Sequence, residues 1–266
     1  GSDDAVRQEA GILLKKKIAT FAPKLTTQQQ KVMKNRLVEQ LFAENSMAVA
    51  NTIAGIIATA TVSLQWPELA SVLEQLIKDP NEKHRILALT LVSELSGVAF
   101  YLPTQLISEV LVAGCEDSVD SVAKAAAAGV INCIRALQVV KQGVMNFSPV
   151  VPPFLRVLHR CLANEEDNAV ILGFQHLRMT FFFPEPLIND HFEALTELIF
   201  TILLDPHQDS YEPVVKQEAQ STFIHLIRVL SKQFAQKDLV RPTLFRLMNR
   251  ISEEKGCVIK NENEDP

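Results

Sequence analysis

The chain has 266 residues, of which 47% are apolar and only 6% aromatic, and its formal net charge is -5. This apolar content is enough to bury a core and excludes extensive disorder outside the ends, while the shortage of aromatic residues favours helices over a β-sandwich or barrel. The negative charge argues against direct nucleic-acid binding, because contacts with phosphates need a basic surface.

Two amphipathic helices are predicted in the first part of the chain. Apolar residues recur at helical spacing over 6–18, while charged residues take the other faces of that helix. Pro23 then interrupts the pattern, and Thr26 or Thr27 is a suitable N-cap for a second helix that reaches Phe42. Each helix therefore has one apolar face that must pack against a neighbour.

The next predicted helix, 47–64, contains no charged residue. It is either covered on both sides within a stack of helices or presents an apolar face to a partner. No uninterrupted apolar run reaches about 18 residues, so we expect no membrane insertion. After Trp66 and Pro67, a one-sided apolar stripe predicts a short helix that ends near Ile77.

The rest of the chain continues this alternation of helices and short connectors. Further helices are predicted over 86–95, 103–115, 118–137, 149–163, 168–183, 186–204, 213–234 and 239–254. The onsets of every second helix fall near Asp4, Ser46, Asn81, Ser118, Asn168 and Pro213, at intervals centred on about 40 residues. This period predicts an all-α HEAT-repeat solenoid, an α-α superhelix of about six antiparallel helix pairs.

The predicted array is one domain over residues 3–259, and its first repeat is truncated. We interpret Gly1 and Ser2 as the remnant of a cleaved tag. The polar, acidic residues 260–266 are expected to form a disordered tail.

Two local motifs resemble importin-β-type karyopherins, a family of nuclear transport receptors. The second helix of their first HEAT repeat is similar to the segment with Asp4, Val6, Arg7, Gln8 and Lys15-Lys16-Lys17-Ile18. The turn that opens their third repeat is similar to Trp66-Pro67-Glu68-Leu69. The repeat pattern looks closest to the large importins that carry ribosomal proteins and histones. The first helix of repeat one is absent, and Phe21 stands where the family often has Trp.

The resemblance implies a receptor that acts as a monomer and shuttles between cytoplasm and nucleus. It implies binding of Ran-GTP, basic cargo such as ribosomal proteins or histones, and phenylalanine-glycine nucleoporins. The candidates for contact with Ran are Arg7, Lys15, Asn51 and Thr52. The candidates for basic cargo are Glu94, Asp120, Glu165, Glu166 and Glu218. The candidates for nucleoporins are Phe181, Phe182 and Phe183.

Each of these three sets also has a structural interpretation. The Ran candidates could be solvated side chains or intrahelical pairs, the acidic residues could be helix caps, and the three phenylalanines could close the core at a helix end. A different class of function is also open, in which the chain is a HEAT scaffold subunit of a multiprotein complex and never meets Ran.

No catalytic or metal-binding pattern is present in the sequence. The four cysteines lie far apart, and the six histidines show neither metal-ligand nor base-nucleophile spacing. Phosphate-binding glycine loops, nucleophile elbows and His-Glu-x-x-His motifs are missing as well. We therefore predict a binding protein that is not an enzyme and has no cofactor and no metal.

Overall fold

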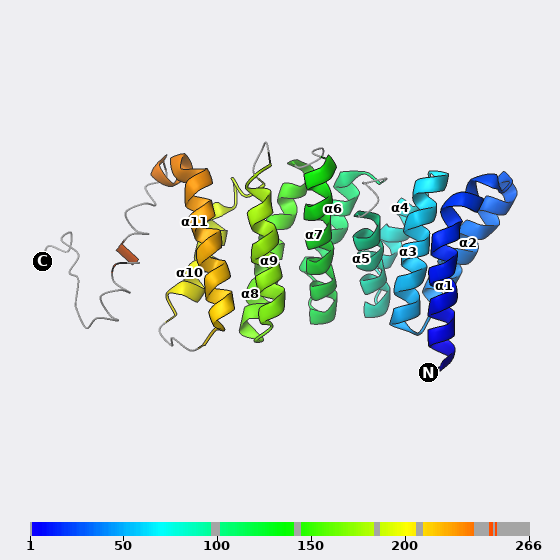
Figure 1. Cartoon of the computed structure of the whole chain (residues 1–266), viewed down its shortest axis with the longest axis horizontal. Coiled ribbons are helices and arrows are strands. Elements are labelled where there is room, and N and C mark those ends of the chain that lie inside the picture. Colours follow the sequence, from blue (N-terminus) through cyan, green and yellow to red (C-terminus); the bar gives the residue numbers. More distant parts are fainter. Residues whose placement is uncertain are drawn as a thin grey trace, which may run out of the picture.

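The computed structural model describes residues 2–96, 102–140, 145–183, 187–205 and 210–236, together with residues 245, 246 and 248. Across these residues the chain forms eleven α-helices and two short 3-10 helices, and no strand. The α-helices stack side by side in sequence order into an elongated array with two layers (Figure 1). This arrangement confirms the predicted all-α HEAT-repeat solenoid.

Helices of odd number form one layer, which we call the odd layer, and helices of even number form the other. The odd layer contains α1 (Ser2–Phe21), α3 (Met47–Leu64), α5 (Glu82–Ser96), α7 (Asp120–Val140), α9 (Asp167–Thr180) and α11 (Pro213–Gln236). The even layer contains α2 (Thr27–Ala43), α4 (Leu69–Ile77), α6 (Thr104–Cys115), α8 (Val151–Ala163) and α10 (Phe192–Leu203). The 3-10 helices are η1 (Ala22–Lys24) and η2 (Met145–Val150).

The onsets of the odd-layer helices lie within two residues of the predicted positions. Successive odd-layer helices contact one another, and each odd-layer helix after α1 also contacts the even-layer helix that precedes it in the chain. A repeat of this kind contacts only its neighbours, and its apolar stripe is buried by stacking. The helix period in the sequence was therefore sufficient to predict both the pairing and the stacking order.

The boundaries differ from prediction most clearly at α10. A helix was predicted over 186–204, but α10 begins only at Phe192, and His191 is its N-cap. The residues just before it include Asn189 and Asp190, whose short polar side chains compete with helical hydrogen bonding. The predicted helix 239–254 and the predicted tail 260–266 lie almost wholly outside the described residues.

The N-cap of α2 is Thr26 rather than Thr27. The Thr26 hydroxyl accepts a hydrogen bond from the Gln29 backbone N–H, and the Gln29 side chain accepts one from the Thr26 N–H at 2.9 Å. This capping box satisfies two backbone donors that the helix itself cannot pair. It fixes the direction in which α2 leaves the end of α1.

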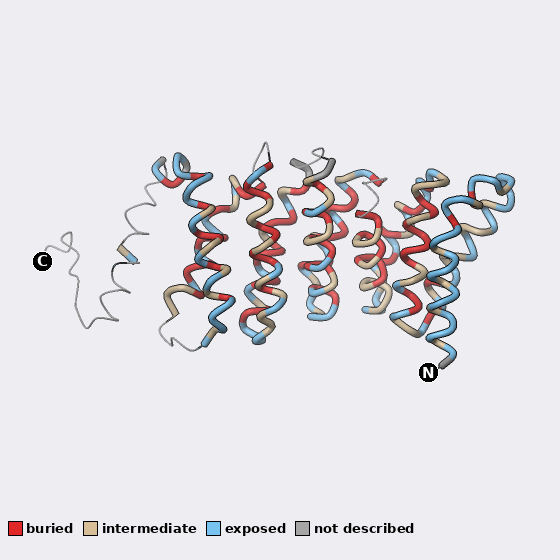
Figure 2. The backbone as a smooth tube through the Cα atoms, in the orientation of Figure 1, coloured by how far each residue is buried: buried red, intermediate tan, exposed pale blue. Residues whose placement is uncertain are grey.

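The hydrophobic core runs along the seam between the two layers, where the buried faces of the helices meet (Figure 2). One continuous cluster extends from Leu41 to Phe234. A second, smaller cluster contains Ile18, Ala22, Ile56 and Ala60, and it joins α1 and η1 to α3. The terminal helix α1 is thus attached through few buried apolar residues.

The uncharged helix α3 lies within the stack, between α1 and α5. By length and composition it could cross a membrane, and half of its residues are buried in the array. A core helix of a helical stack satisfies the same two criteria, because it too is surrounded by apolar side chains. Its position matches the first of the two interpretations offered for 47–64.

Candidate protein-binding surface

Helices α1 and α3 approach each other closely at two glycines. A Cβ atom on Gly11 would lie only 2.6 Å from the Thr52 methyl carbon, so only glycine lets α3 pack this near to α1. On the opposite helix, a Cβ atom on Gly55 would lie 2.9 Å from Lys15 Cε. The two helices therefore present their polar residues as one surface of the odd layer.

All four residues predicted to contact Ran lie on this pair of helices. Arg7 is exposed, and it donates to Glu44 Oε2 at 2.6 Å and also to Asp4. Asn51 is exposed, whereas the Thr52 hydroxyl donates to the Ala48 carbonyl at 3.0 Å. The structure brings these residues together, and their contact with Ran stays a prediction.

Lys15 is paired with a residue from a different predicted set. Its Nζ lies 2.8 Å from Glu94 Oε2 on α5, and the pair passes over Gly55 of α3. The two side chains retain 41% and 38% of their exposure, so they are open to solvent and to partners. A candidate Ran contact and a candidate cargo contact thus neutralise each other in the isolated chain.

Three further acidic candidates also lie in ion pairs between repeats. Asp120 lies 3.6 Å from the Arg160 guanidinium, and Glu166 pairs with Lys124. Glu218 lies 2.5 Å from Arg178. These residues therefore have a structural role in ion pairs, which differs from the helix-cap interpretation, and their binding to cargo stays a prediction.

Glu165 differs from the other acidic candidates. It is exposed, and its φ of 58° lies in the left-handed region, at the turn between α8 and α9. Together with Asp167 and Glu212 it lines a cavity of about 560 Å³ beside the starts of α9 and α11, where Lys216 is the one basic residue of the lining. An acid-lined recess of this kind can attract a basic side chain from solution.

Polar side chains connect successive repeats in a regular register. The partners in these contacts are separated by about one repeat in the sequence, since most lie 37 to 43 residues apart. The contacts are Arg7–Glu44, Asn132–Ser93, Arg156–Glu116, Lys124–Glu166, Arg135–His176, Ser148–His191 and Arg178–Glu218. The Lys15–Glu94 pair is separated by 79 residues and so bridges two repeats instead of one.

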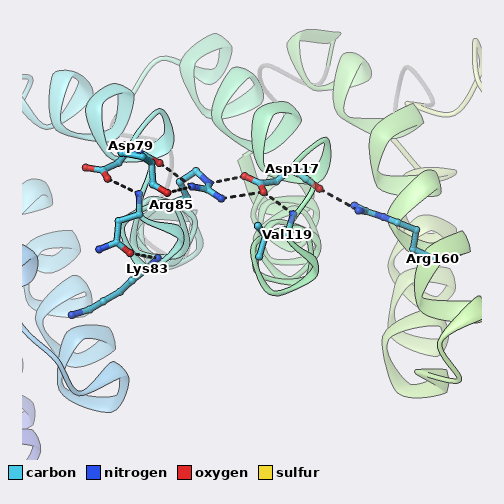
Figure 3. A network of polar contacts seen from close by, with 8 residues as sticks. Asp79, Lys83, Arg85, Asp117, Val119 and Arg160 are labelled. Carbon is cyan, nitrogen blue, oxygen red and sulfur yellow. Dashed lines mark hydrogen bonds and ion pairs between the residues drawn. The ribbon is translucent and has the colours of Figure 1, made fainter.

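A network centred on Asp117 joins three repeats at the connectors (Figure 3). Arg85 Nε donates to Asp117 Oδ2 at 2.6 Å, and a second guanidinium nitrogen of Arg85 reaches Asp79 O at 2.9 Å. Asp117 Oδ1 accepts from the Val119 backbone N–H at 2.9 Å, while the Asp117 carbonyl accepts from Arg160 at 3.2 Å. The network holds the connectors before α5 and α7 in place.

Sequence analysis did not single out the arginines of this network. A signal was present, because Asp79 and Asp117 each stand shortly before an odd-layer helix and are one repeat apart. Burial by itself would raise the pKa of Asp117, but hydrogen bonds from Arg85 and Val119 and the charges of Arg85 and Arg160 outweigh burial and lower that pKa. Asp117 is therefore ionised at neutral pH.

The three consecutive phenylalanines do not share one environment. Phe181 and Phe183 are buried, whereas Phe182 is 72% exposed and stacks edge-on against His225 at 6.5 Å between ring centroids. The core-closing interpretation describes the two buried rings. Only Phe182 is accessible to a nucleoporin in this conformation, so the predicted contact now depends on that residue.

His176 is the one fully buried histidine among the described residues, and it joins α9 to α7. Its Nε2 accepts a hydrogen bond of 2.7 Å from Arg135 Nε, and its Nδ1 donates to the Leu172 carbonyl at 2.7 Å. Burial lowers the pKa of His176, the hydrogen bond to Leu172 opposes this shift, and the charge of Arg135 lowers the pKa further. The imidazole is therefore neutral in the folded protein.

We expect this buried imidazole to make the folded chain sensitive to acid. An unfolded histidine takes up a proton near pH 6.5, whereas folded His176 does so only at lower pH. The stability that depends on His176 is thus complete above about pH 6.5 and is lost as the pH falls towards the folded pKa. Replacing His176 with Gln, which can still accept from Arg135, should flatten the decline in unfolding free energy measured between pH 7 and 5.

A matched control for this prediction is His159→Gln. His159 is exposed on α8. This substitution should leave the decline in unfolding free energy as steep as in the wild type. An equal decline in the His176→Gln and wild-type proteins would contradict the assignment.

The described cysteines are Cys115, Cys133 and Cys161, and all three are buried free thiols. Burial raises the pKa of Cys115 and of Cys133 to about 12, and it also raises the pKa of Cys161. Among the described residues, no group of His, Cys, Asp and Glu is arranged to hold a metal ion. These thiols pack as small apolar side chains.

The fold and this surface define an α-helical repeat array in which stacked helices expose polar residues. The chain belongs to the family described as "IPO5-like, TPR repeats", whose family model matches residues 43–198. This match confirms the resemblance to importin-β-type karyopherins. A comparison with curated proteins found no match.

Solved structures of the karyopherin Kap121p share the fold. Kap121p bound to Pho4p superposes with a TM-score of 0.65 at 18% sequence identity, over 85% of this chain and 21% of that one. Kap121p bound to RanGTP gives a TM-score of 0.62 at 19% identity, with the same coverage. The complex with the SUMO protease Ulp1p gives 0.64 at 18% identity, over 84% and 21% of the two chains. The chain thus spans about a fifth of the length of these karyopherins.

Proposed function

We propose that the chain is part of a nuclear import receptor and that α1 and α3 bind Ran in its GTP form. The family match over residues 43–198 carries this proposal. It is supported by the fold shared with a karyopherin whose solved complex contains RanGTP. The surface supports it too, since Arg7, Lys15 and Asn51 lie on two adjacent helices of the odd layer and remain accessible.

The same proposal also states how the receptor binds cargo and nucleoporins and where it acts in the cell. Basic cargo would bind the acidic residues of the odd layer, where Glu165 lines an acid-rich cavity. A nucleoporin phenylalanine would pack near the exposed ring of Phe182. The receptor would work as a monomer with one continuous array over residues 3–259, and would move between cytoplasm and nucleus without an enzymatic step.

Binding of Ran loaded with a non-hydrolysable GTP analogue, compared with Ran-GDP, tests the central claim. We expect binding to the GTP form only. Reversing charge with Arg7→Glu and Lys15→Glu together should weaken that binding at least about tenfold, because like charges would then face each other in the interface.

Lys31→Glu provides the matched control for these variants. Lys31 is exposed on α2 in the even layer, so this reversal changes the net charge as much as either single reversal does, without altering the odd layer. Its affinity for Ran should match that of the wild type. Equal binding of both nucleotide forms would reject the transport function and favour a scaffold subunit, whereas selective binding that tolerates the reversed charges would reject only these two residues.

A further inference from the structure

Helix α1 is attached to the array differently from the other odd-layer helices. Ile18 is the only residue within α1 that belongs to the buried core, while Val6 and Leu13 are 65% and 58% exposed. The continuous core that holds the other helices together does not include α1. Its attachment therefore depends on close packing against α3 together with polar contacts.

Two ion pairs supply the polar part of that attachment. One joins α1 to the next helix in the chain, and the other joins α1 to a helix two repeats further along. Arg7 connects α1 to Glu44 at the end of α2, which is the next helix in the chain. Lys15 passes over α3 and reaches Glu94 on α5. In an ordinary repeat array each unit contacts only its neighbours, so a link across two repeats restrains three helices at once.

Gly55 leaves room for this long link. A Cβ atom at that position would lie 2.9 Å from Lys15 Cε and 3.0 Å from Glu94 Oε2, which are the atoms that cross α3. Glycine in the middle of a helix weakens it by roughly 1 kcal/mol relative to Ala. A buried glycine at the midpoint of α3 is therefore costly to the helix but leaves a channel for the ion pair.

We propose that the Lys15–Glu94 pair is a salt-sensitive latch that holds α1 against α3 and α5, and that opening it lets α1 move relative to the rest of the array. The latch is open to solvent, since both side chains keep about two-fifths of their exposure, so ions and partners can reach it. A partner carboxylate that takes the place of Glu94 on Lys15 couples its own binding to release of α1. The proposal holds whether or not that partner is Ran.

Hydrogen-deuterium exchange of α1, with α9 as the internal reference, tests the latch in the intact chain. Glu94→Gln keeps the size of the side chain and removes its charge, so amide exchange in α1 should become about two- to fivefold faster at low salt. The wild-type protein at about 1 M salt should exchange at the rate of this variant. The double charge swap Lys15→Glu with Glu94→Lys should restore slow exchange.

Two further variants separate the latch from general effects on stability. Glu9→Gln removes the same negative charge from an exposed residue of α1 and should leave exchange unchanged. Gly55→Ala strengthens α3 as a helix and brings a methyl group against the flexible ends of Lys15 and Glu94, which can shift together, so it should change exchange in α1 less than Glu94→Gln does. Unchanged exchange of α1 in Glu94→Gln, or failure of the charge swap to restore slow exchange, would overturn the proposal.

Discussion

Replacing Phe154 with Ala should lower the free energy of unfolding by about 3 to 5 kcal/mol. The ring of Phe154 lies on α8 and is fully buried in the continuous core. Removing it forfeits the transfer free energy of a large apolar side chain and leaves a cavity that rigid neighbouring helices fill only in part. Urea unfolding followed by circular dichroism would measure the loss.

The same substitution at an exposed phenylalanine is the control for this prediction. Phe182→Ala removes an identical ring that is 72% exposed, so the free energy of unfolding should change by less than about 0.5 kcal/mol. Comparable losses in the two variants would show that α8 is not packed as described. The same Phe182→Ala protein is also suited to testing the proposed nucleoporin contact, since its fold should be intact.

The second large effect is expected at the Asp117 network. Asp117→Ala should destabilise the chain by about 2 to 4 kcal/mol, because the Arg85 guanidinium is left without its carboxylate in a largely buried position. The side chains of Arg85 and Asp117 keep only 15% and 12% of their exposure. The Val119 N–H loses its acceptor as well.

Asp120→Ala is the control for this network. Its carboxylate is 55% exposed and lies 3.6 Å from Arg160, so its removal should cost no more than about 1 kcal/mol. Since the pKa of Asp117 is lowered, its contribution to stability is complete above the ordinary carboxyl pKa and is lost as the pH falls through the folded pKa. Asp117→Asn should therefore lose less stability than the wild type between pH 5 and 3, and an identical acid transition would contradict the network.

The fold could be predicted because two patterns are visible in the sequence itself. Apolar residues recur at helical spacing within each helix, and pairs of helices recur about every 40 residues. Each amphipathic stripe shows which face is buried, and the interval shows which helices pair. Boundaries were harder, as α10 illustrates. Its start at Phe192 is not marked in the apolar pattern, which continues back through the buried residues Leu187 and Ile188.

The polar surface was predictable only in part. Arg7, Lys15 and Asn51 lie on two odd-layer helices that contact each other, as the repeat pattern predicted. The partner of Lys15 could not be inferred, since Glu94 lies 79 residues away and the pair depends on the space at Gly55. A contact over two repeats depends on helix spacing and tilt, which arise only when the whole stack is assembled.

The three buried thiols can be used to detect separation of the central helices, because a buried thiol does not react with a reagent in solution. Cys115, Cys133 and Cys161 lie on three successive helices in the middle of the chain, α6, α7 and α8. With pKa values of about 12 for the first two, hardly any thiolate forms at neutral pH while the helices stay closed. A thiol-reactive dye would label them only when the central repeats separate, so the labelling rate would reveal whether strain applied at one end travels to the middle.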